Sequence, residues 1–264
     1  MKVYIGLDIG GTKTNAGLIT ENGDILRTKE VPSNAKKGNK AILNTITTLV
    51  RDVAGGTTFH GIGIGVAGHV DHVKNRIATA GPNFLPSFNR VDLAPGLLKE
   101  FKVPTVIEND AKVYALSEAI FGRGKGYRRV VTVTLGTGIG GGIIQDGHIT
   151  HGKNNLAGEV GQMFTQGNKK RWEQLASGNA FNKHSDITKG AKMLADGFYN
   201  LLNILDPDII VVGGGLSREK GLIEAVKKET RKMLHYTALA KTPIKKSSLL
   251  NNAPILGAML RVRG

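Results

Sequence analysis

The sequence predicts a mixed α/β protein of two related lobes. A strand that runs into a glycine-rich turn and continues as a second strand occurs twice, over Val3–Ile25 and over Val130–Ile149. Elsewhere, apolar residues alternate between the spacing of amphipathic helices and short apolar runs that are typical of buried strands. A repeat spaced by about half of a 264-residue chain indicates two lobes of similar construction.

The first half is predicted to hold an antiparallel meander followed by alternating helices and strands. Asn22-Gly23 is a hairpin signal, so the first repeat should continue into a third strand over Asp24–Val31. The apolar spacing then predicts a helix over Asn39–Val53, a strand over His60–Val66, helices around Asp92–Phe101 and Ala111–Phe121, and between these two a strand over Val103–Ile107.

The second half is predicted to repeat this plan. Asp146-Gly147 is its hairpin signal, and Ile187–Leu205 has the spacing of a long amphipathic helix. An apolar strand over Ile209–Val212 runs into three glycines, after which Ser217 is placed to cap a helix that reaches His235. We therefore expect lobes over residues 1–112 and 113–264, with a last helix at about 253–263 that packs back on the first lobe.

The composition excludes several classes of protein. The chain has no cysteine, which excludes disulfides and thiolate metal sites and favours a reducing compartment. Its apolar runs are shorter than the roughly 20 residues that a membrane-spanning helix needs, and its start lacks the apolar stretch of a signal peptide. We therefore expect a cytoplasmic protein without a membrane partner.

The net charge of +15 favours an anionic substrate or partner, although a basic solvated surface is the simpler explanation. The sequence shows no zinc finger, no RNA-binding strand signature and no helix-turn-helix. Aromatic residues make up only 5% of the chain, which is little for base stacking. No specific nucleic acid is expected as a partner.

The two glycine-rich turns are the first candidates for a binding site. Consecutive glycines after a strand let backbone N–H groups approach an anion without a Cβ in the way. Thr12 and Thr137 add one hydroxyl to each turn. A single turn of this kind is more often a tight hairpin or a bulge, but two in matching contexts indicate a site that grips a polyphosphate from both sides.

Five short motifs follow one another along nearly the whole chain: Asp8–Lys13 (DIGGTK), Glu108–Ala111 (ENDA), Leu135–Gly142 (LGTGIGGG), Ala157–Gly161 (AGEVG) and Gly213–Gly215 (GGG). In this order they resemble the first phosphate loop, catalytic segment, second phosphate loop, sugar loop and adenosine loop of the ROK sugar kinases, in the actin/hexokinase/Hsp70 superfamily. The resemblance implies two ribonuclease-H-like lobes with a central cleft, and a hexose kinase that uses ATP and Mg²⁺.

The resemblance also implies the catalytic and nucleotide-binding residues. Phosphoryl transfer needs positioning, charge neutralisation and a base, and Asp110 is the implied base, although the residues alone fit a helix cap equally well. Asp8 would hold Mg²⁺ through water, with a turn-forming aspartate as the alternative. The implied nucleotide-binding residues are Gly10, Gly11, Thr12, Lys13, Gly136, Thr137, Gly138, Gly213, Gly214 and Gly215.

The same resemblance implies a set of sugar-binding residues. Glu159 leads it, since a carboxylate accepts hydrogen bonds from adjacent sugar hydroxyls, and Asn109 offers both a donor and an acceptor. Ordinary turn roles stay open for two members of the set, Gly68 and Asn83. The full set is Gly68, Asn83, Asn109, Asp110, Glu159, Gln162 and Glu173.

The chain departs from the family pattern beside the sugar loop. The family commonly has a histidine three residues after the loop glutamate and then a zinc site of cysteines, whereas this chain has Gln162 and no cysteine over Met163–Arg171. We therefore expect no zinc, and glucose as the sugar ahead of mannose, fructose and the N-acetylated hexosamines. Ala67 replaces a usual proline, which should change only loop stiffness.

Two non-enzymatic functions on this fold are the alternatives. Sugar-sensing regulators carry an added N-terminal DNA-binding domain, for which a pattern that begins at Val3 leaves no room. A nucleotide-binding protein without turnover is disfavoured by the intact Asp8 and Asp110. Inorganic polyphosphate as a second donor is a further hypothesis, since short polyphosphate glucokinases resemble the chain in size and at Asn251-Asn252-Ala253. A homodimer is a hypothesis by analogy of fold alone.

Overall fold

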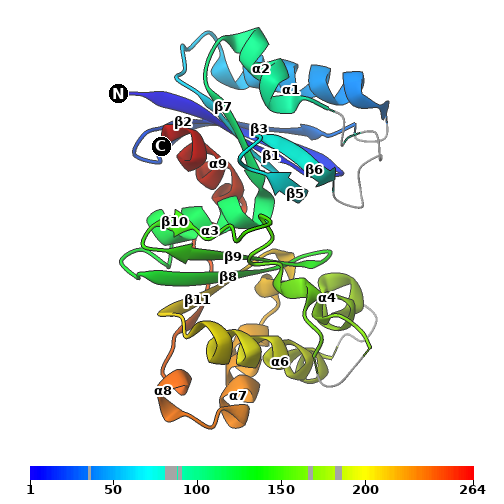
Figure 1. Cartoon of the computed structure of the whole chain (residues 1–264), viewed down its shortest axis with the longest axis vertical. Helices are drawn as coiled ribbons and strands as arrows, with labels where there is room; N and C mark the ends of the chain where they lie inside the picture. Colours follow the sequence, from blue (N-terminus) through cyan, green and yellow to red (C-terminus); the bar gives the residue numbers. More distant parts are fainter. Residues whose placement is uncertain (35–36, 81–87, 89–90, 166–168, 182–185) are drawn as a thin grey trace. The chain divides into compact units, whose positions relative to one another are not determined.

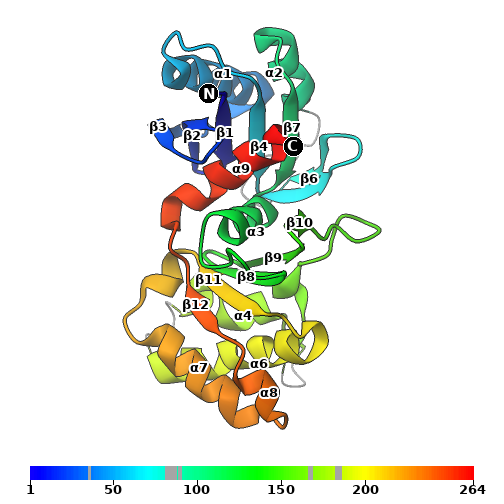
Figure 2. The ribbon, with the colours of Figure 1, turned by 90° about the vertical axis from the view of Figure 1, so that its left-hand side faces the viewer.

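The computed structural model describes residues 1–34, 37–80, 88, 91–165, 169–181 and 186–264. The chain divides into two compact units. Unit 1 consists of residues 1–117, 151–156 and 252–264, and unit 2 of residues 118–150 and 157–251. The red C-terminal helix is accordingly found beside the blue N-terminal strands in unit 1 (Figures 1 and 2).

Unit 1 is built on a five-stranded sheet with a separate hairpin. Its strands are β1 Val3–Ile9, β2 Lys13–Thr20, β3 Ile25–Pro32, β4 Ile62–Val66, β5 Gly68–Asp71, β6 Arg76–Ala80 and β7 Thr105–Asn109. The sheet order is β3-β2-β1-β4-β7, and β5 pairs with β6. β1, β2 and β3 are antiparallel neighbours, whereas β4 and β7 continue the sheet parallel to β1.

Helices cover both faces of this sheet. α1 (Asn39–Ala54) packs on β2 and β3, and α2 (Leu93–Phe101) packs on β7, while α9 (Ala253–Arg263) lies on β1 and β4 (Figure 1). The buried residues of α1 recur with helical spacing, which is why this segment forms an amphipathic helix: they are Ile42, Ile46, Leu49, Val50, Val53 and Ala54. α3 (Asp110–Ile120) follows β7 directly.

Glycines on β1 and β4 let the backbone of α9 lie directly on the sheet. A Cβ on Gly63 would be 1.7 Å from the Ala258 carbonyl oxygen, and a Cβ on Gly6 would be 2.0 Å from that of Ile255. We expect Gly63→Ala to lower the free energy of unfolding by about 1–3 kcal/mol or more, because neither the backbone of β4 nor that of α9 can move without distortion. Denaturant titration measures this.

Gly96→Ala is the matched control for Gly63→Ala. Gly96 lies inside α2, and the nearest atom to its added Cβ is a Leu43 methyl at 3.5 Å, an ordinary contact. Alanine there should raise the free energy of unfolding by up to about 1 kcal/mol, since glycine is a poor helix former. Equal stabilities of the two variants would contradict the close packing of α9 on the sheet.

Unit 2 repeats the sheet of unit 1. Its strands are β8 Arg129–Leu135, β9 Ile139–Gln145, β10 His148–Ile149, β11 Ile209–Gly213 and β12 Ile244–Lys246. The order is β10-β9-β8-β11-β12, with β8, β9 and β10 antiparallel and β11 and β12 parallel to β8. This is the arrangement of β3-β2-β1-β4-β7, so the internal repeat predicted from the sequence is confirmed.

The main helices of unit 2 pack on each other and on its sheet. These are α6 (Ile187–Leu205) and α7 (Leu222–Met233), which contribute Phe198, Leu202 and Val226 to the same buried cluster as Val131 and Val133 of β8. The short helices are α4 Trp172–Ala176, α5 Gly178–Phe181 and α8 Thr237–Ala240, and the 3₁₀ turns are η3 Val160–Gln162, η4 Gly215–Arg218 and η5 Leu250–Asn252. Among the helices that the structure describes, none has the length and apolar character needed to cross a bilayer.

Two element predictions are wrong in detail. Ser217 does not cap a helix to His235, because its Oγ donates to the Gly214 carbonyl at 2.7 Å within η4, and α7 begins only at Leu222. The strand predicted over Val103–Ile107 is displaced by two residues, to Thr105–Asn109. Lys102 closes α2 in the left-handed conformation with φ of 56°, so the chain needs two more residues before it can join the sheet.

Candidate functional site

The carboxyl ends of β1, β4 and β7 lie side by side in unit 1, because these strands are parallel and in register. Asp8 on β1 pairs with Gly65 on β4, and Gly65 pairs with Glu108 on β7. Asp110 begins α3 just after β7, and its Cα is only 3.8 Å from the place of a Cβ on Gly65. Ligand sites in sheets of this kind form outside the carboxyl ends of the strands.

Asp8 and Asp110 form a pair of like charges. Burial and then the charge of Asp110 raise the pKa of Asp8 to about 7, against a lowering hydrogen bond with Asn15. Burial also raises the pKa of Asp110, against hydrogen bonds from backbone N–H groups. Two close carboxylates are donor chemistry that suits Mg²⁺, which takes one or two carboxylates together with phosphate oxygens and water. These residues therefore fit a magnesium ion.

The described residues contain no group of three or more His, Asp or Glu side chains that could hold a metal ion by itself. A metal ion at Asp8 would therefore need ligands from water and from a bound phosphate. This dependence on a substrate is usual for Mg²⁺ in phosphoryl transfer.

Asn109 caps α3 and orients Asp110. Its Oδ1 accepts a hydrogen bond from the Lys112 N–H at 3.1 Å, as an N-cap residue does. Its Nδ2 donates to the Gly68 carbonyl at 2.9 Å and to Asp110 Oδ1 at 3.1 Å. Asp110 Oδ1 also accepts from the Ala111 N–H at 2.8 Å. The structure thus brings Gly68, Asn109 and Asp110 together, and both amide hydrogens of Asn109 are already engaged.

The first glycine turn joins β1 to β2 and is held by Ser33. The Gly10 N–H donates to the Lys13 carbonyl at 3.0 Å and closes the turn. Ser33 Oγ donates to the Gly10 carbonyl at 2.6 Å, and the Ser33 N–H donates to the Thr12 carbonyl at 2.9 Å. Sequence reasoning missed Ser33, because a serine after a strand carries no sign of the turn it will contact. Lys13 forms an exposed ion pair with Glu30.

Two further glycine segments lie at the ends of neighbouring parallel strands of unit 2: the second is Gly136–Gly138 and the third is Gly213–Gly215. The second follows β8 and the third follows β11, whose Gly213 pairs with Thr134. Gly214 has φ of +82°, and a Cβ there would be 2.4 Å from the Leu135 carbonyl oxygen. Only glycine fits this position, and its fit brings the two segments into direct backbone contact.

A pocket of about 360 Å³ in unit 2 lies against the second glycine segment. Gln162 Nε2 donates to Glu173 Oε1 at 2.8 Å, so two predicted sugar-binding side chains are joined here. Glu159 is exposed and precedes η3 as its N-cap residue. The pocket is lined by Thr137, Gly138, Glu173, Gln174, Ser177, Asn179 and Ala180.

Trp172 anchors the loop that lacks cysteines. Its indole is fully buried in unit 2 and meets the Phe198 ring edge-on, with 5.8 Å between the ring centroids. Gly197 makes room for it, since a Cβ there would be 2.1 Å from the indole. The backbone N–H of Trp172 donates to the Met163 carbonyl at 2.7 Å, and its indole N–H donates to the Met193 carbonyl at 3.0 Å. Burial of a large aromatic ring thus fixes the residue that directly precedes Glu173.

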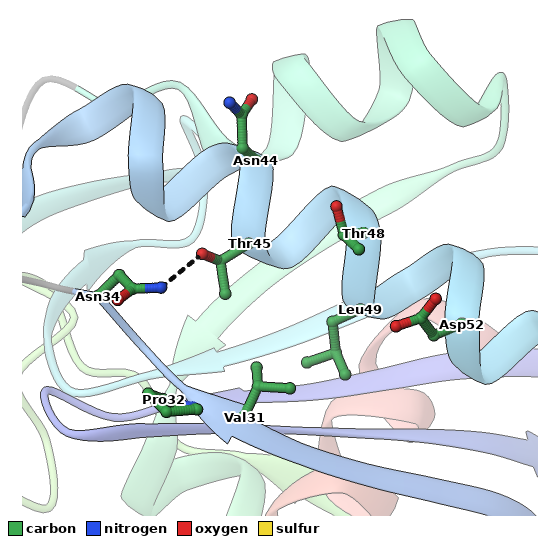
Figure 3. A pocket seen from close by; sticks show the side chains of 8 residues that line it. All are labelled: Val31, Pro32, Asn34, Asn44, Thr45, Thr48, Leu49 and Asp52. Atoms are coloured by element: carbon green, nitrogen blue, oxygen red, sulfur yellow. Dashed lines mark hydrogen bonds between the residues drawn. The ribbon is translucent and has the colours of Figure 1, made fainter.

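A second pocket, of about 340 Å³, lies between β3 and α1 in unit 1 (Figure 3). Asn34 Nδ2 donates to Thr45 Oγ1 at 3.1 Å across it, and Val31 and Leu49 form an apolar part of its wall. Among the predicted site residues that the structure describes, none lines it. Its lining residues are Val31, Pro32, Asn34, Asn44, Thr45, Thr48, Leu49 and Asp52.

The predicted site residues are divided between the two units, except Asn83, which lies outside the described residues. Unit 1 holds Asp8, Gly10, Gly11, Thr12, Lys13, Gly68, Asn109 and Asp110. Unit 2 holds Gly136, Thr137, Gly138, Glu159, Gln162, Glu173, Gly213, Gly214 and Gly215.

The chain is similar to a known family of proteins along its whole length. The model of the ROK family matches residues 4–193 and 186–264. A glucokinase from Streptomyces coelicolor is 31% identical, over 89% of this chain and 89% of the glucokinase.

Solved structures agree with this similarity. A ROK family glucokinase from Streptomyces griseus, in complex with glucose and AMPPNP, has a TM-score of 0.86 at 27% identity and covers 99% of both chains. An inorganic polyphosphate/ATP-glucomannokinase from Arthrobacter sp. strain KM has a TM-score of 0.78 at 25% identity, over 99% of this chain and 98% of that one.

Proposed function

Since the chain belongs to the ROK family and is a sugar kinase of the phosphotransferase class, we propose that it transfers the γ-phosphoryl group of ATP to a hydroxyl of glucose. The observation that carries this proposal is the pair of carboxylates, Asp8 and Asp110, at the carboxyl ends of β1 and β7, the two strands that flank β4. The glucokinases among the relatives support glucose as the acceptor.

Asp110 is the general base in this proposal. Its carboxylate accepts the proton of the attacking sugar hydroxyl, and the hydrogen bonds from Asn109 and Ala111 fix Oδ1 so that the side chain keeps one orientation. Because both amide hydrogens of Asn109 are used, this residue offers a sugar hydroxyl only the second lone pair of Oδ1. Glu159, Gln162 and Glu173 contribute sugar contacts from unit 2.

The glycine segments hold the nucleotide. The Gly10 and Gly136 N–H groups close their own turns, and other backbone N–H groups of Gly10–Lys13 and of Gly136–Gly138 bind phosphate oxygens. Gly213–Gly215 accommodates the adenosine. Asp8 would hold Mg²⁺ through water, and the bound ion would neutralise charge on the phosphates. Ser33 supports the first turn, because its hydroxyl and its backbone N–H donate to the Gly10 and Thr12 carbonyls.

Inorganic polyphosphate is the second candidate donor, and mannose is the second candidate acceptor. The net charge of +15 favours a long anionic donor, and the polyphosphate/ATP-glucomannokinase is similar over nearly its whole length. Binding of such a donor would depend strongly on salt, because exposed charges are screened.

A panel of sugars assayed with each donor tests the proposal. We expect ATP and glucose to give the highest kcat/KM, at least about tenfold above fructose and the N-acetylated hexosamines, since one changed group in a pocket discriminates by about 1–3 kcal/mol. Mass spectrometry of the phosphorylated products measures this, with the Asp110→Asn variant as the blank. A panel in which no sugar is phosphorylated by either donor would contradict the proposal.

A further inference from the structure

Residues 151–156 belong to unit 1, although the chain before and after them belongs to unit 2. Side chains of unit 1 contact this segment at His151, which is described below, and at Asn154 and Asn155. His69 Nε2 is 2.9 Å from the Asn154 carbonyl oxygen, while His72 Nδ1 contacts Asn155 Oδ1 and Lys112 Nζ contacts the Asn155 carbonyl. The segment is therefore fixed in unit 1 by side chains from several elements.

His151 forms the innermost of these contacts, with Glu108. The Glu108 side chain is only 1% exposed, and its Oε2 is 2.7 Å from His151 Nε2 and 3.3 Å from Arg261 Nε. Burial alone would raise the pKa of Glu108, but the hydrogen bond with His151, the Asn109 N–H and the charge of Arg261 hold that pKa below its ordinary value. An ionised carboxylate only accepts hydrogen bonds, so His151 Nε2 is the donor.

The His151–Glu108 contact continues to the catalytic carboxylate. Glu108 Oε1 accepts from the Asn109 N–H at 2.9 Å, and Asn109 Nδ2 donates to Asp110 Oδ1 at 3.1 Å. Three hydrogen bonds thus connect the imidazole with Asp110. The imidazole itself is fixed by stacking on the His72 ring, with 3.7 Å between centroids and 12° between planes.

We propose that His151 is a positioning residue for phosphoryl transfer: through Glu108 and Asn109 it holds the Asp110 carboxylate in its working orientation. The inference rests on the proposed function in one respect, the role of Asp110 as the general base. Stability alone does not require a buried carboxylate here, because apolar residues of similar volume usually serve a core at least as well as a buried ion pair. The Glu108 carboxylate instead lies close to Asp110 in the chain and accepts a hydrogen bond from the Asn109 backbone N–H.

Three substitutions of His151 test this. Leucine removes the donor, asparagine is too short to reach Glu108, and glutamine places an amide Nε2 close to where His151 Nε2 lies. We expect the leucine and asparagine variants to lose kcat by about 10–100-fold with KM for ATP nearly unchanged, since a small misplacement of a catalytic group has effects of this order. The glutamine variant should keep at least about a third of the wild-type kcat.

Hydrogen exchange makes the test independent of the proposed function. Peptides covering residues 105–112 should exchange faster in the leucine or asparagine variant than in wild type, whether or not the protein is a kinase. His60→Leu is the control, since His60 is another histidine of unit 1 whose ring contacts the Val3 carbonyl and lies 6.0 Å from the Tyr4 ring, between centroids. It should leave both kcat and this exchange unchanged. If the leucine variant does not fold, the asparagine and glutamine pair decides.

Two results would overturn the proposal. One is an asparagine variant that keeps the wild-type kcat and exchange over 105–112, because positioning would then not need the donor. The other is an equal loss in the asparagine and glutamine variants, because the hydrogen bond to Glu108 would then not be the cause. An inactive wild type with the expected exchange pattern would overturn the proposed function and leave the positioning of Asp110 standing.

Discussion

Replacing Asp8 by asparagine is expected to raise the Mg²⁺ concentration that half-saturates the sugar kinase by about 10–100-fold. Losing a side chain that holds a metal through water has effects of this order. When both proteins are compared without Mg²⁺, the variant should be at least as stable as wild type, because the substitution removes one of two carboxylates that repel each other. Activity titrated with Mg²⁺, and Mn²⁺ binding in the presence of nucleotide measured by electron spin resonance, check the first expectation. Thermal unfolding checks the second.

Asp52→Asn is the matched control for Asp8→Asn. Asp52 is an exposed aspartate of unit 1 that pairs with Lys29 at 2.7 Å and lines the pocket of Figure 3. An exposed pair of this kind contributes little to stability, and its loss should leave the Mg²⁺ dependence unchanged. If both variants behave like wild type with Mg²⁺, Asp8 has no part in holding the ion.

Local pattern predicted two helices well, because burial on one face decides α6 and a nearly continuous apolar run decides α9. The predicted helix over Ile187–Leu205 and the last helix over Ala253–Arg263 have these bounds in the structure. Asp206 in the left-handed conformation ends the first. Ser217 shows the limit of this reasoning, since its hydroxyl found a carbonyl of the preceding turn instead of a helix to cap.

The sequence could place the glycine motifs at strand ends, but it could not show what holds them. Strand pattern and consecutive glycines are local signals, whereas the register of β1, β4 and β7 is set by pairing between segments far apart in the chain. Ser33 and Trp172 act through contacts with distant parts of the chain, for which no local pattern exists. The same holds for residues 151–156, which pack in unit 1 although the segments around them belong to unit 2.

The structure bears on the alternative that Asp110 is only a helix cap. From the residues, Asp110 fitted a helix cap as well as a base. In the fold, Asn109 Oδ1 takes the N-cap hydrogen bond from Lys112, so the cap does not depend on Asp110 alone. The carboxylate accepts hydrogen bonds from the N–H of the next residue, from its own backbone N–H and from the amide of Asn109. Burial raises the pKa of this carboxyl, which means that its ionised form is disfavoured in the fold.

Asp110→Asn is the substitution with the largest expected effect. The asparagine keeps an Oδ1 that can accept from Asn109 and Ala111, so folding and binding of sugar and nucleotide should persist. It cannot take a proton from the sugar hydroxyl. Removal of a general base typically costs on the order of 10²–10⁴ in rate, or about 3–5 kcal/mol of transition-state stabilisation. Steady-state kinetics should show this loss in kcat with little change in KM for the sugar.

Asp186→Asn is the matched control that shows what the same substitution does at a residue that only caps a helix. Asp186 is the N-cap residue of α6, where its carboxylate accepts from the Thr188 and Lys189 N–H groups. Since asparagine caps helices nearly as well as aspartate, this control should be silent in both stability and rate. If Asp110 were only a cap, its asparagine variant would be equally silent. An Asp110→Asn variant that keeps more than about a tenth of the wild-type kcat falls short of the smallest loss typical of a general base, and would therefore remove Asp110 from the mechanism.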